Sequence, residues 1–157
     1  MALIGFAIFA VTMFAVSTVL MSKWTTLAAA TAQEAQQSFE DVRARFGATE
    51  PYVAIDADGN VRVTRELDLE QTTKLRTLHL MAYEPERAQL VDVAFPYWFV
   101  ALKLSDSMNL GTMTTVLARD WDHLDLRVTE EELEALGPAL VLDHALENGA
   151  RIMLWTE

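Results

Sequence analysis

The stretch LRTLHLMAYEPERAQLVDVAF (residues 75–95) predicts two β-strands joined by a tight turn. Successive side chains of a strand point to opposite faces, so Leu78 and Leu80 share one face while His79 and Met81 share the other. The proline in the middle of the stretch suits a turn position, where its fixed φ angle is an advantage. We therefore expect a β-hairpin in the middle of the chain.

Two further hairpins are predicted on either side of it. Residues 51–67 hold two short runs of β-forming residues around an Asp-Gly pair, and residues 139–157 hold two such runs around an Asn-Gly pair. Both pairs favour the tight turns that join antiparallel strands. Three hairpins with no β-α-β alternation predict a small α+β domain with a mostly antiparallel, hairpin-built sheet over residues 48–157.

A short helix is predicted within this domain, over residues 129–136. Thr129 stands at the N-cap and Glu132 three positions later, which is the spacing of a capping box. Gly137 and Pro138 follow and favour the end of the helix at that point.

The first 22 residues, MALIGFAIFAVTMFAVSTVLMS, contain no charged side chain. At about 1.5 Å per residue, a helix of this length spans roughly 30 Å, the thickness of a bilayer core. Lys23 and Trp24 follow directly and are predicted membrane-interface residues, because Trp and Lys both favour the headgroup level. A transmembrane helix over residues 1–22 is therefore predicted. A cleaved signal peptide is the alternative, with a small-residue site at 28–32.

Residues 23–47 are rich in Ala, Gln and Glu and contain no Gly or Pro before Gly47. This composition predicts a juxtamembrane helical stalk that continues the membrane helix. Phe39, Val42 and Phe46 share one face of that helix, so its far end is expected to pack on the domain. The few basic residues beyond the apolar segment favour an N-terminus outside and a domain in the cytoplasm.

Composition narrows the classes of function. The chain has 23 carboxylates against 12 Lys and Arg, a net charge of −11, and such an acidic protein repels nucleic acid. The absence of cysteine excludes disulfides, iron–sulfur clusters and thiol catalysis. No G-x-S-x-G, S-x-x-K or Gly-rich phosphate loop occurs. We expect neither an enzyme, nor a cofactor, nor a small-molecule substrate.

Two acidic motifs invite a metal interpretation. Asp120, Asp122, His123 and Asp125 are weak candidate metal ligands, since carboxylates and imidazole bind Zn, Mn or Mg. No second cluster with ligand spacing completes that site, so a solvated acidic loop is the favoured interpretation. DADGN (residues 56–60) resembles the start of a calcium loop, but its glycine and closing position do not match an EF-hand, which favours a plain turn.

The stretch FPYWFVALKL (residues 95–104) is apolar except for Lys103. Pro96 suits the first turn of a helix, and the helix that follows is apolar on every side. Such a helix lies wholly in a core, or partly in a core and partly against a partner. For the second case, the predicted docking residues are Phe95, Tyr97, Trp98 and Phe99.

Together these features predict a single-pass membrane-anchored accessory or structural subunit. It would stabilise a larger membrane complex, such as a respiratory or photosynthetic assembly, through its helix and its domain. Its expected partners are other integral membrane subunits and the lipid bilayer. A stand-alone membrane-tethered binding domain is a further alternative.

The Gly5-Phe6 pair offers another alternative, because it resembles a prepilin processing site. An apolar N-terminal helix followed by a hairpin-built domain is similar to the layout of type IV pilins and pseudopilins. The sequence departs from that family at its leader, MALI, which has no basic residue, and at Ala10, where the family has a glutamate. The resemblance implies a pilin-like or secretion-system assembly protein.

Overall fold

The computed structural model describes residues 24–56, 59–104 and 126–157. Its strands are β1 (Thr25–Ala29), β2 (Val53–Ile55), β3 (Val61–Val63), β4 (Thr77–Glu84), β5 (Gln89–Pro96), β6 (Leu140–Ala145) and β7 (Arg151–Thr156). Its helices are α2 (Ala32–Arg45), α3 (Tyr97–Leu104), α5 (Glu130–Leu136) and the 3₁₀ helix η1 (Pro85–Arg87).

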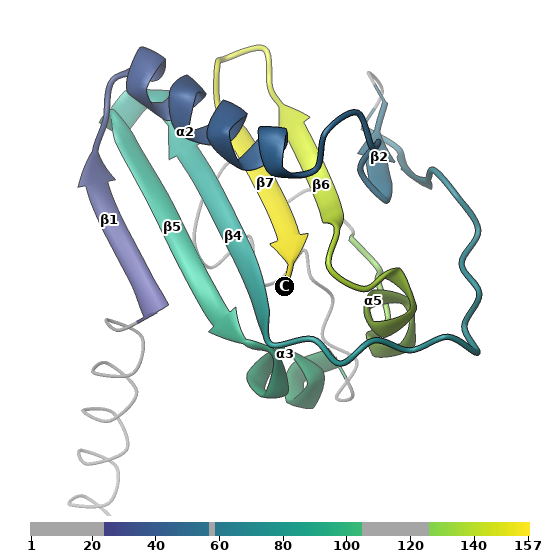
Figure 1. Cartoon of the computed structure of the whole chain (residues 1–157). Coiled ribbons are helices and arrows are strands. Elements are labelled where there is room, and N and C mark those ends of the chain that lie inside the picture. The colour runs from purple at the N-terminus through teal and green to yellow at the C-terminus, as the bar shows by residue number, and fades with distance from the viewer. Residues whose placement is uncertain (1–23, 57–58, 105–125) are drawn as a thin grey trace, which may run out of the picture.

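The strands form one seven-stranded sheet in the order β1-β5-β4-β7-β6-β2-β3 (Figure 1). The predicted hairpins β2–β3, β4–β5 and β6–β7 are all present and antiparallel. β4 pairs with β7, which joins two of these hairpins through the middle of the sheet. β2 instead runs parallel to β6, so the sheet is mixed.

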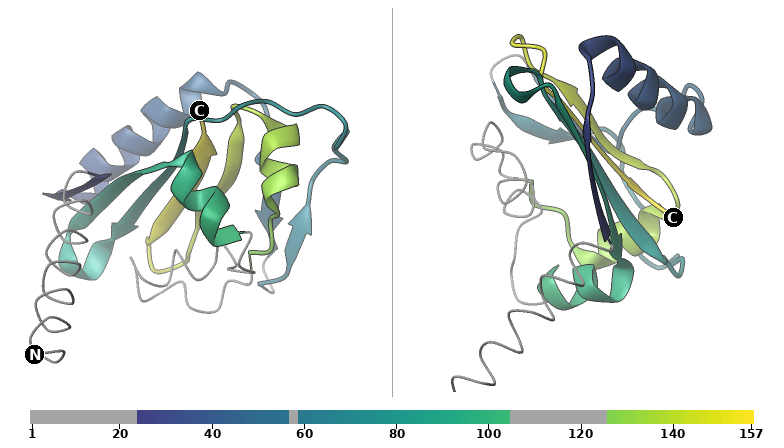
Figure 2. Two further views of the ribbon diagram at one scale, coloured as in Figure 1. Left: turned by 90° about the horizontal axis from the view of Figure 1, so that it is seen from below. Right: turned by 90° about the vertical axis from the view of Figure 1, so that its left-hand side faces the viewer.

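The two faces of the sheet carry different cores. On one face, α2 crosses the strands as a separate layer (Figure 2), and Phe39 packs there with Met153 and Trp155. On the other face, Leu78 and Leu80 are buried in a larger cluster that includes Val100 of α3 and Leu133 of α5. The alternation predicted for β4 is confirmed, since Met81 belongs to the first core.

The predicted helical stalk over residues 23–47 is wrong. Thr25–Ala29 is a strand that pairs antiparallel with β5, and Ala30 donates its backbone N–H to the carbonyl of Ala88 at 2.9 Å. A new helix starts at Ala32, because the Thr31 side chain accepts a hydrogen bond from the backbone N–H of Glu34, and the Glu34 carboxylate accepts from the N–H of Thr31.

The far end of α2 follows the sequence more closely. Gly47 has a positive φ of 59° just after the helix, as expected for the residue that ends it. Phe39 and Val42 are buried and Phe46 packs against the same core, so the predicted packing of this face is confirmed. The capping box of α5 at Thr129 and Glu132 is also confirmed.

These findings correct the predicted fold class. In place of a transmembrane helix that continues into a stalk and an α+β domain, the described residues form a mostly β domain, with short helices around one mixed sheet. Within the described ranges no helix combines the length and the apolar character needed to cross a bilayer. The longest of them, α2, has 14 residues and exposes a polar face.

The predicted single-pass membrane location, with the domain in the cytoplasm, is corrected by the same finding and is not supported. Residues 1–22 and Lys23, on which that prediction rested, lie outside the described residues.

Candidate interaction site

The corner between β5 and α3 places the aromatic residues of the stretch 95–104. Pro96 is the last residue of β5 and Tyr97 the first of α3. The Tyr97 backbone N–H donates to the carbonyl of Arg76 at 2.8 Å, which fixes the start of the helix beside the start of β4. The chain turns sharply here, so consecutive aromatic side chains point in different directions.

The inward side of this corner is core. Phe95, Tyr97 and Val100 are all buried. The Tyr97 hydroxyl donates to the carbonyl of Glu130 at 3.4 Å, which links α3 to the start of α5. Burial, together with the nearby carboxylates of α5, raises the pKa of Tyr97 well above its ordinary value, so the phenol stays neutral.

The outward side of the corner is an aromatic patch, which we define as Trp24, Trp98 and Phe99. Trp98 is 64% exposed. Its ring lies edge-on to Trp24, with centroids 6.5 Å apart, and edge-on to Phe99, with centroids 5.9 Å apart. Trp24 and Phe99 are partly buried and pack on the core, with their own centroids 5.8 Å apart. Trp98 is thus an exposed ring held in place by two anchored rings.

The outer edge of β1 continues from this patch, because Trp24 directly precedes the strand. Ala30 makes a backbone hydrogen bond toward Ala88 of the neighbouring hairpin. In an antiparallel pair, every second residue bonds the same neighbour, so the N–H and C=O groups of Thr25, Leu27 and Ala29 point away from β5. No strand lies beyond β1 among the described residues.

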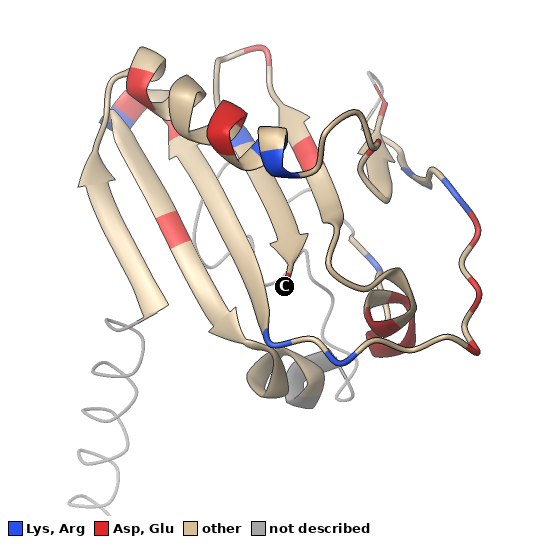
Figure 3. Ribbon diagram, in the orientation of Figure 1, with Lys and Arg blue, Asp and Glu red and all other residues tan. Residues whose placement is uncertain are grey.

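The side chains along β1 suit contact with another polypeptide. Leu27 is 62% exposed, on the face it shares with the buried Val91. β1 contains no charged residue, as Figure 3 shows along the whole strand. Proteins usually protect an edge strand with charged side chains, proline or a bulge, and β1 has none of the first two.

The predicted docking residues therefore differ in their exposure. Phe95 and Tyr97 belong to the core, Phe99 lies between core and surface, and Trp98 is the exposed ring. Of the predicted membrane-interface pair, Trp24 is described and belongs to the aromatic patch. Leu27 was not among the predicted site residues, because its strand was predicted as helix. Two signals in the sequence favoured the strand. Thr25 and Thr26 are β-branched, and the capping box at Thr31 starts a new helix only after residue 30.

The predicted metal ligands Asp120, Asp122, His123 and Asp125 lie outside the described residues. Within the parts of the chain that the structure describes, no group of three or more His, Cys, Asp or Glu side chains could hold a metal ion.

A polar cluster lies on the α2 side of the sheet, next to the core that contains Trp155. The His79 ring stacks on Trp155 with centroids 4.8 Å apart, and its Nε2 lies 3.5 Å from a carboxylate oxygen of Glu157. Arg45, in the last turn of α2, donates to the other oxygen. The cluster joins α2 to the end of β7.

The pKa values of two carboxyl groups near His79 are shifted in opposite directions. Burial pushes the pKa of Glu157 up, but the hydrogen bond from Arg45 and the charge of His79 outweigh it and the net pKa is lowered. Burial raises the pKa of Asp92, and the nearby His79 only partly offsets that effect. The Glu157 carboxylate thus links α2, through Arg45, to β4, through His79, which is a structural role.

No protein-family model, no curated protein and no solved structure matches this chain.

Proposed function

We propose that this chain is an accessory or structural protein whose domain binds a partner protein through the aromatic patch and the free edge of β1. The observation that carries the proposal is Trp98, a large aromatic side chain that is 64% exposed although two neighbouring rings hold it in one position. Exposed tryptophans of this kind are costly in water and are enriched among the residues that dominate interface energies.

The position of Trp98 supports the proposal because the ring is pre-organised. A side chain fixed before binding loses little conformational freedom when a partner covers it, so more of its contact energy appears as affinity. Its edge-on contacts with Trp24 and Phe99 supply this order without burying the outer face of the ring.

The edge of β1 supplies the second part of the surface. Its outward backbone groups can accept an additional strand, and Leu27 adds an exposed apolar side chain beside them. The strand is uncharged although the chain carries a net charge of −11, so this surface differs from its acidic surroundings. A partner would be recognised here by apolar contact and backbone pairing.

The test is to purify the tagged full chain with its native partners and to compare Trp98→Ala with wild type. An interface tryptophan of this kind contributes about 2 kcal/mol or more, so the partner should bind at least about thirtyfold more weakly. Gln33→Ala is the control, because Gln33 is exposed on α2 and belongs neither to the patch, nor to β1, nor to the β3 side of the sheet.

Folding must be measured beside binding. Trp98→Ala is expected to lose about 1 kcal/mol of stability or less, since only two edge-on ring contacts disappear. A folded variant that loses its partner supports the proposal. A variant that keeps the partner at wild-type affinity, or that loses it no more than Gln33→Ala does, contradicts it.

A further inference from the structure

The opposite edge of the sheet carries a separate binding surface. β3 is the last strand on that side, and among the described residues no strand lies beyond it. The Thr64 N–H donates to the carbonyl of Tyr52 at 2.9 Å, and the Asp56 N–H donates to the carbonyl of Asn60 at 3.1 Å. These bonds define which backbone groups of β3 face β2.

The alternation of an antiparallel pair then fixes the remaining groups. Asn60, Arg62 and Thr64 face β2, so the N–H and C=O groups of Val61 and Val63 point to the free edge. Both valine side chains are exposed, at 36% and 51%. An extended polypeptide is the ligand whose own backbone groups repeat at the spacing that such an edge offers.

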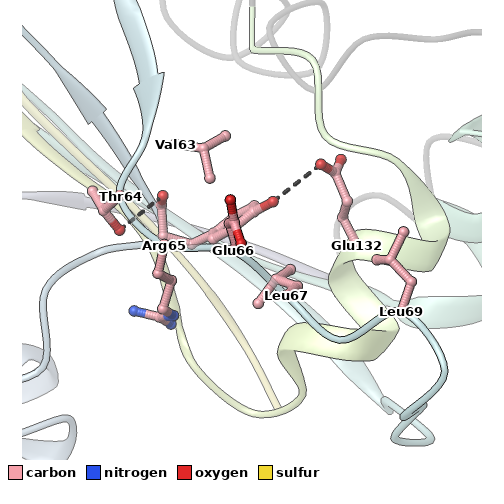
Figure 4. Close-up of a pocket in the computed structure, with 8 residues that line it drawn as sticks. Val63, Thr64, Arg65, Glu66, Leu67, Leu69 and Glu132 are labelled. Carbon is pink, nitrogen blue, oxygen red and sulfur yellow. Dashed lines mark hydrogen bonds between the residues drawn. The ribbon is translucent and has the colours of Figure 1, made fainter.

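A pocket of about 520 Å³ lies directly beside this edge. Its lining includes Val63, Leu67 and Leu69 of the following segment, and Tyr52 and Glu132. Figure 4 shows Val63, Leu67 and Leu69 around the space between this segment and α5, with Glu66 and Glu132 as its labelled carboxylates. The pocket is therefore an apolar hollow with acidic groups on its wall.

Glu132 is held in position by two hydrogen bonds. One oxygen accepts from the Tyr52 hydroxyl at 3.0 Å, and the other accepts from the backbone N–H of Thr129 at 2.7 Å. Each carboxylate oxygen has room for one further donor. The Tyr52 hydroxyl is a dependable donor, because burial and the Glu132 carboxylate raise its pKa to about 12.

Arg65, the nearest basic residue in the pocket lining, is directed elsewhere. Its guanidinium donates to the carbonyl of Glu50 at 2.9 Å and lies over the Tyr52 ring, 6.0 Å from the centroid. In Figure 4 it points away from Glu132. Arg65 and Glu132 therefore make their hydrogen bonds to different groups.

The charge around the pocket favours a basic ligand. Most of the lining residues come from the segments 61–70 and 130–136, which together contain seven carboxylates against two arginines. A basic side chain next to Glu66 and Glu132 gains charge-assisted hydrogen bonds, whereas an acidic one is repelled.

We propose that the edge of β3 and this pocket bind an extended basic segment of a partner polypeptide. The segment adds a strand beside Val61 and Val63, places one apolar side chain in the pocket, and sets a Lys or Arg against Glu66 and Glu132. This surface lies at the opposite end of the strand order from β1 and the aromatic patch, so the inference does not rest on the function proposed above.

The test uses the full chain and a fluorescein-labelled peptide of eight residues that is blocked at both ends. Valine occupies every second position of the peptide. A leucine near the middle and lysines occupy the other positions, so leucine and lysine share one face of the strand. Anisotropy titrations should show binding at least tenfold tighter than that of the same peptide with glutamate at the lysine positions. A third peptide carries N-methyl groups on the alternate amides that would face β3, and its affinity should fall at least tenfold.

Two protein variants complete the experiment. Glu66→Gln should weaken the lysine peptide several-fold without unfolding the domain, because Glu66 is exposed. Trp98→Ala is the control and should bind the peptide like wild type, so failure of this inference is distinguishable from failure of the aromatic patch. No peptide binding, equal affinity for the lysine and glutamate peptides, or no effect of N-methylation would each overturn the proposal.

Discussion

Replacing Phe39 with alanine tests whether α2 is an integral layer of the domain. Phe39 is 1% exposed and lies between the helix and the sheet, in the core that also contains Met153 and Trp155. The guanidinium of Arg151 lies over its ring, 4.8 Å from the centroid. Alanine at this position leaves a cavity between two layers that the rest of α2 cannot close.

The magnitude follows from the buried area. A buried phenylalanine removes about 150–250 Å² from water, which at about 25 cal/mol/Å² is about 4–6 kcal/mol, and alanine retains a part of it. The loss of the cation–π contact adds about 0.5–1 kcal/mol. We therefore expect Phe39→Ala to lower the free energy of unfolding by about 3–5 kcal/mol, in the usual range for this substitution.

Urea unfolding of the full chain, followed by circular dichroism, measures this loss. With a slope of about 1.5 kcal/mol/M, the midpoint should fall by about 2–3 M. Gln33→Ala is the control, because Gln33 is exposed on the same helix, and it should change stability by less than about 0.5 kcal/mol. If Phe39→Ala costs no more than Gln33→Ala, α2 does not pack on the sheet as described.

Three smaller perturbations test other parts of the fold, each by urea unfolding. Thr31→Ala removes the capping box with Glu34 and should cost about 1 kcal/mol, whereas no loss would mean that α2 does not start there. Tyr52→Phe removes the hydrogen bond to Glu132 and should also cost about 1 kcal/mol, and an unchanged midpoint would contradict that bond. The raised pKa of Asp92 means that its ionised form costs stability as pH rises above its ordinary value of 3.8, so Asp92→Asn should raise the urea midpoint at pH 7. That gain should shrink as the pH falls to about 4, and a gain that is independent of pH would refute the assignment.

The sequence predicted the hairpins well because their signals are local. Alternating side chains in β4, the Asn-Gly turn before β7 and the capping box of α5 each act within a few residues, and all three are present. The parallel pairing of β2 with β6 joins residues that are far apart in the chain, and no local pattern reports such a contact.

β1 illustrates a different limit. Ala-rich composition favours a helix over residues 25–29, but propensity is a weak preference that a tertiary partner can override. Here β5 offers an unpaired edge, and the capping box at Thr31 starts the helix only afterwards. The spacing of Thr31 and Glu34 is that of a capping box, and it predicts the helix start that the structure has.

The sequence indicated which segment contains the candidate site, but not which of its side chains are exposed. The composition of residues 95–104 indicated a helix that is apolar on every side, so that more than its core-facing side is apolar. Which ring turns outward depends on the β5–α3 corner and on contact with Trp24, which is distant in sequence. The structure shows that Trp98 faces outward while Tyr97 is buried.

The most direct test of the central proposal is amide hydrogen exchange along β1 in the free chain and in the isolated native complex. Exchange of the outward amides of Thr25, Leu27 and Ala29 should slow at least tenfold in the complex, because a partner then covers this edge. Trp98→Ala should lose this protection while its free-state exchange stays unchanged. Equal exchange at these three amides in the free and bound chain would contradict the proposal that the partner binds here.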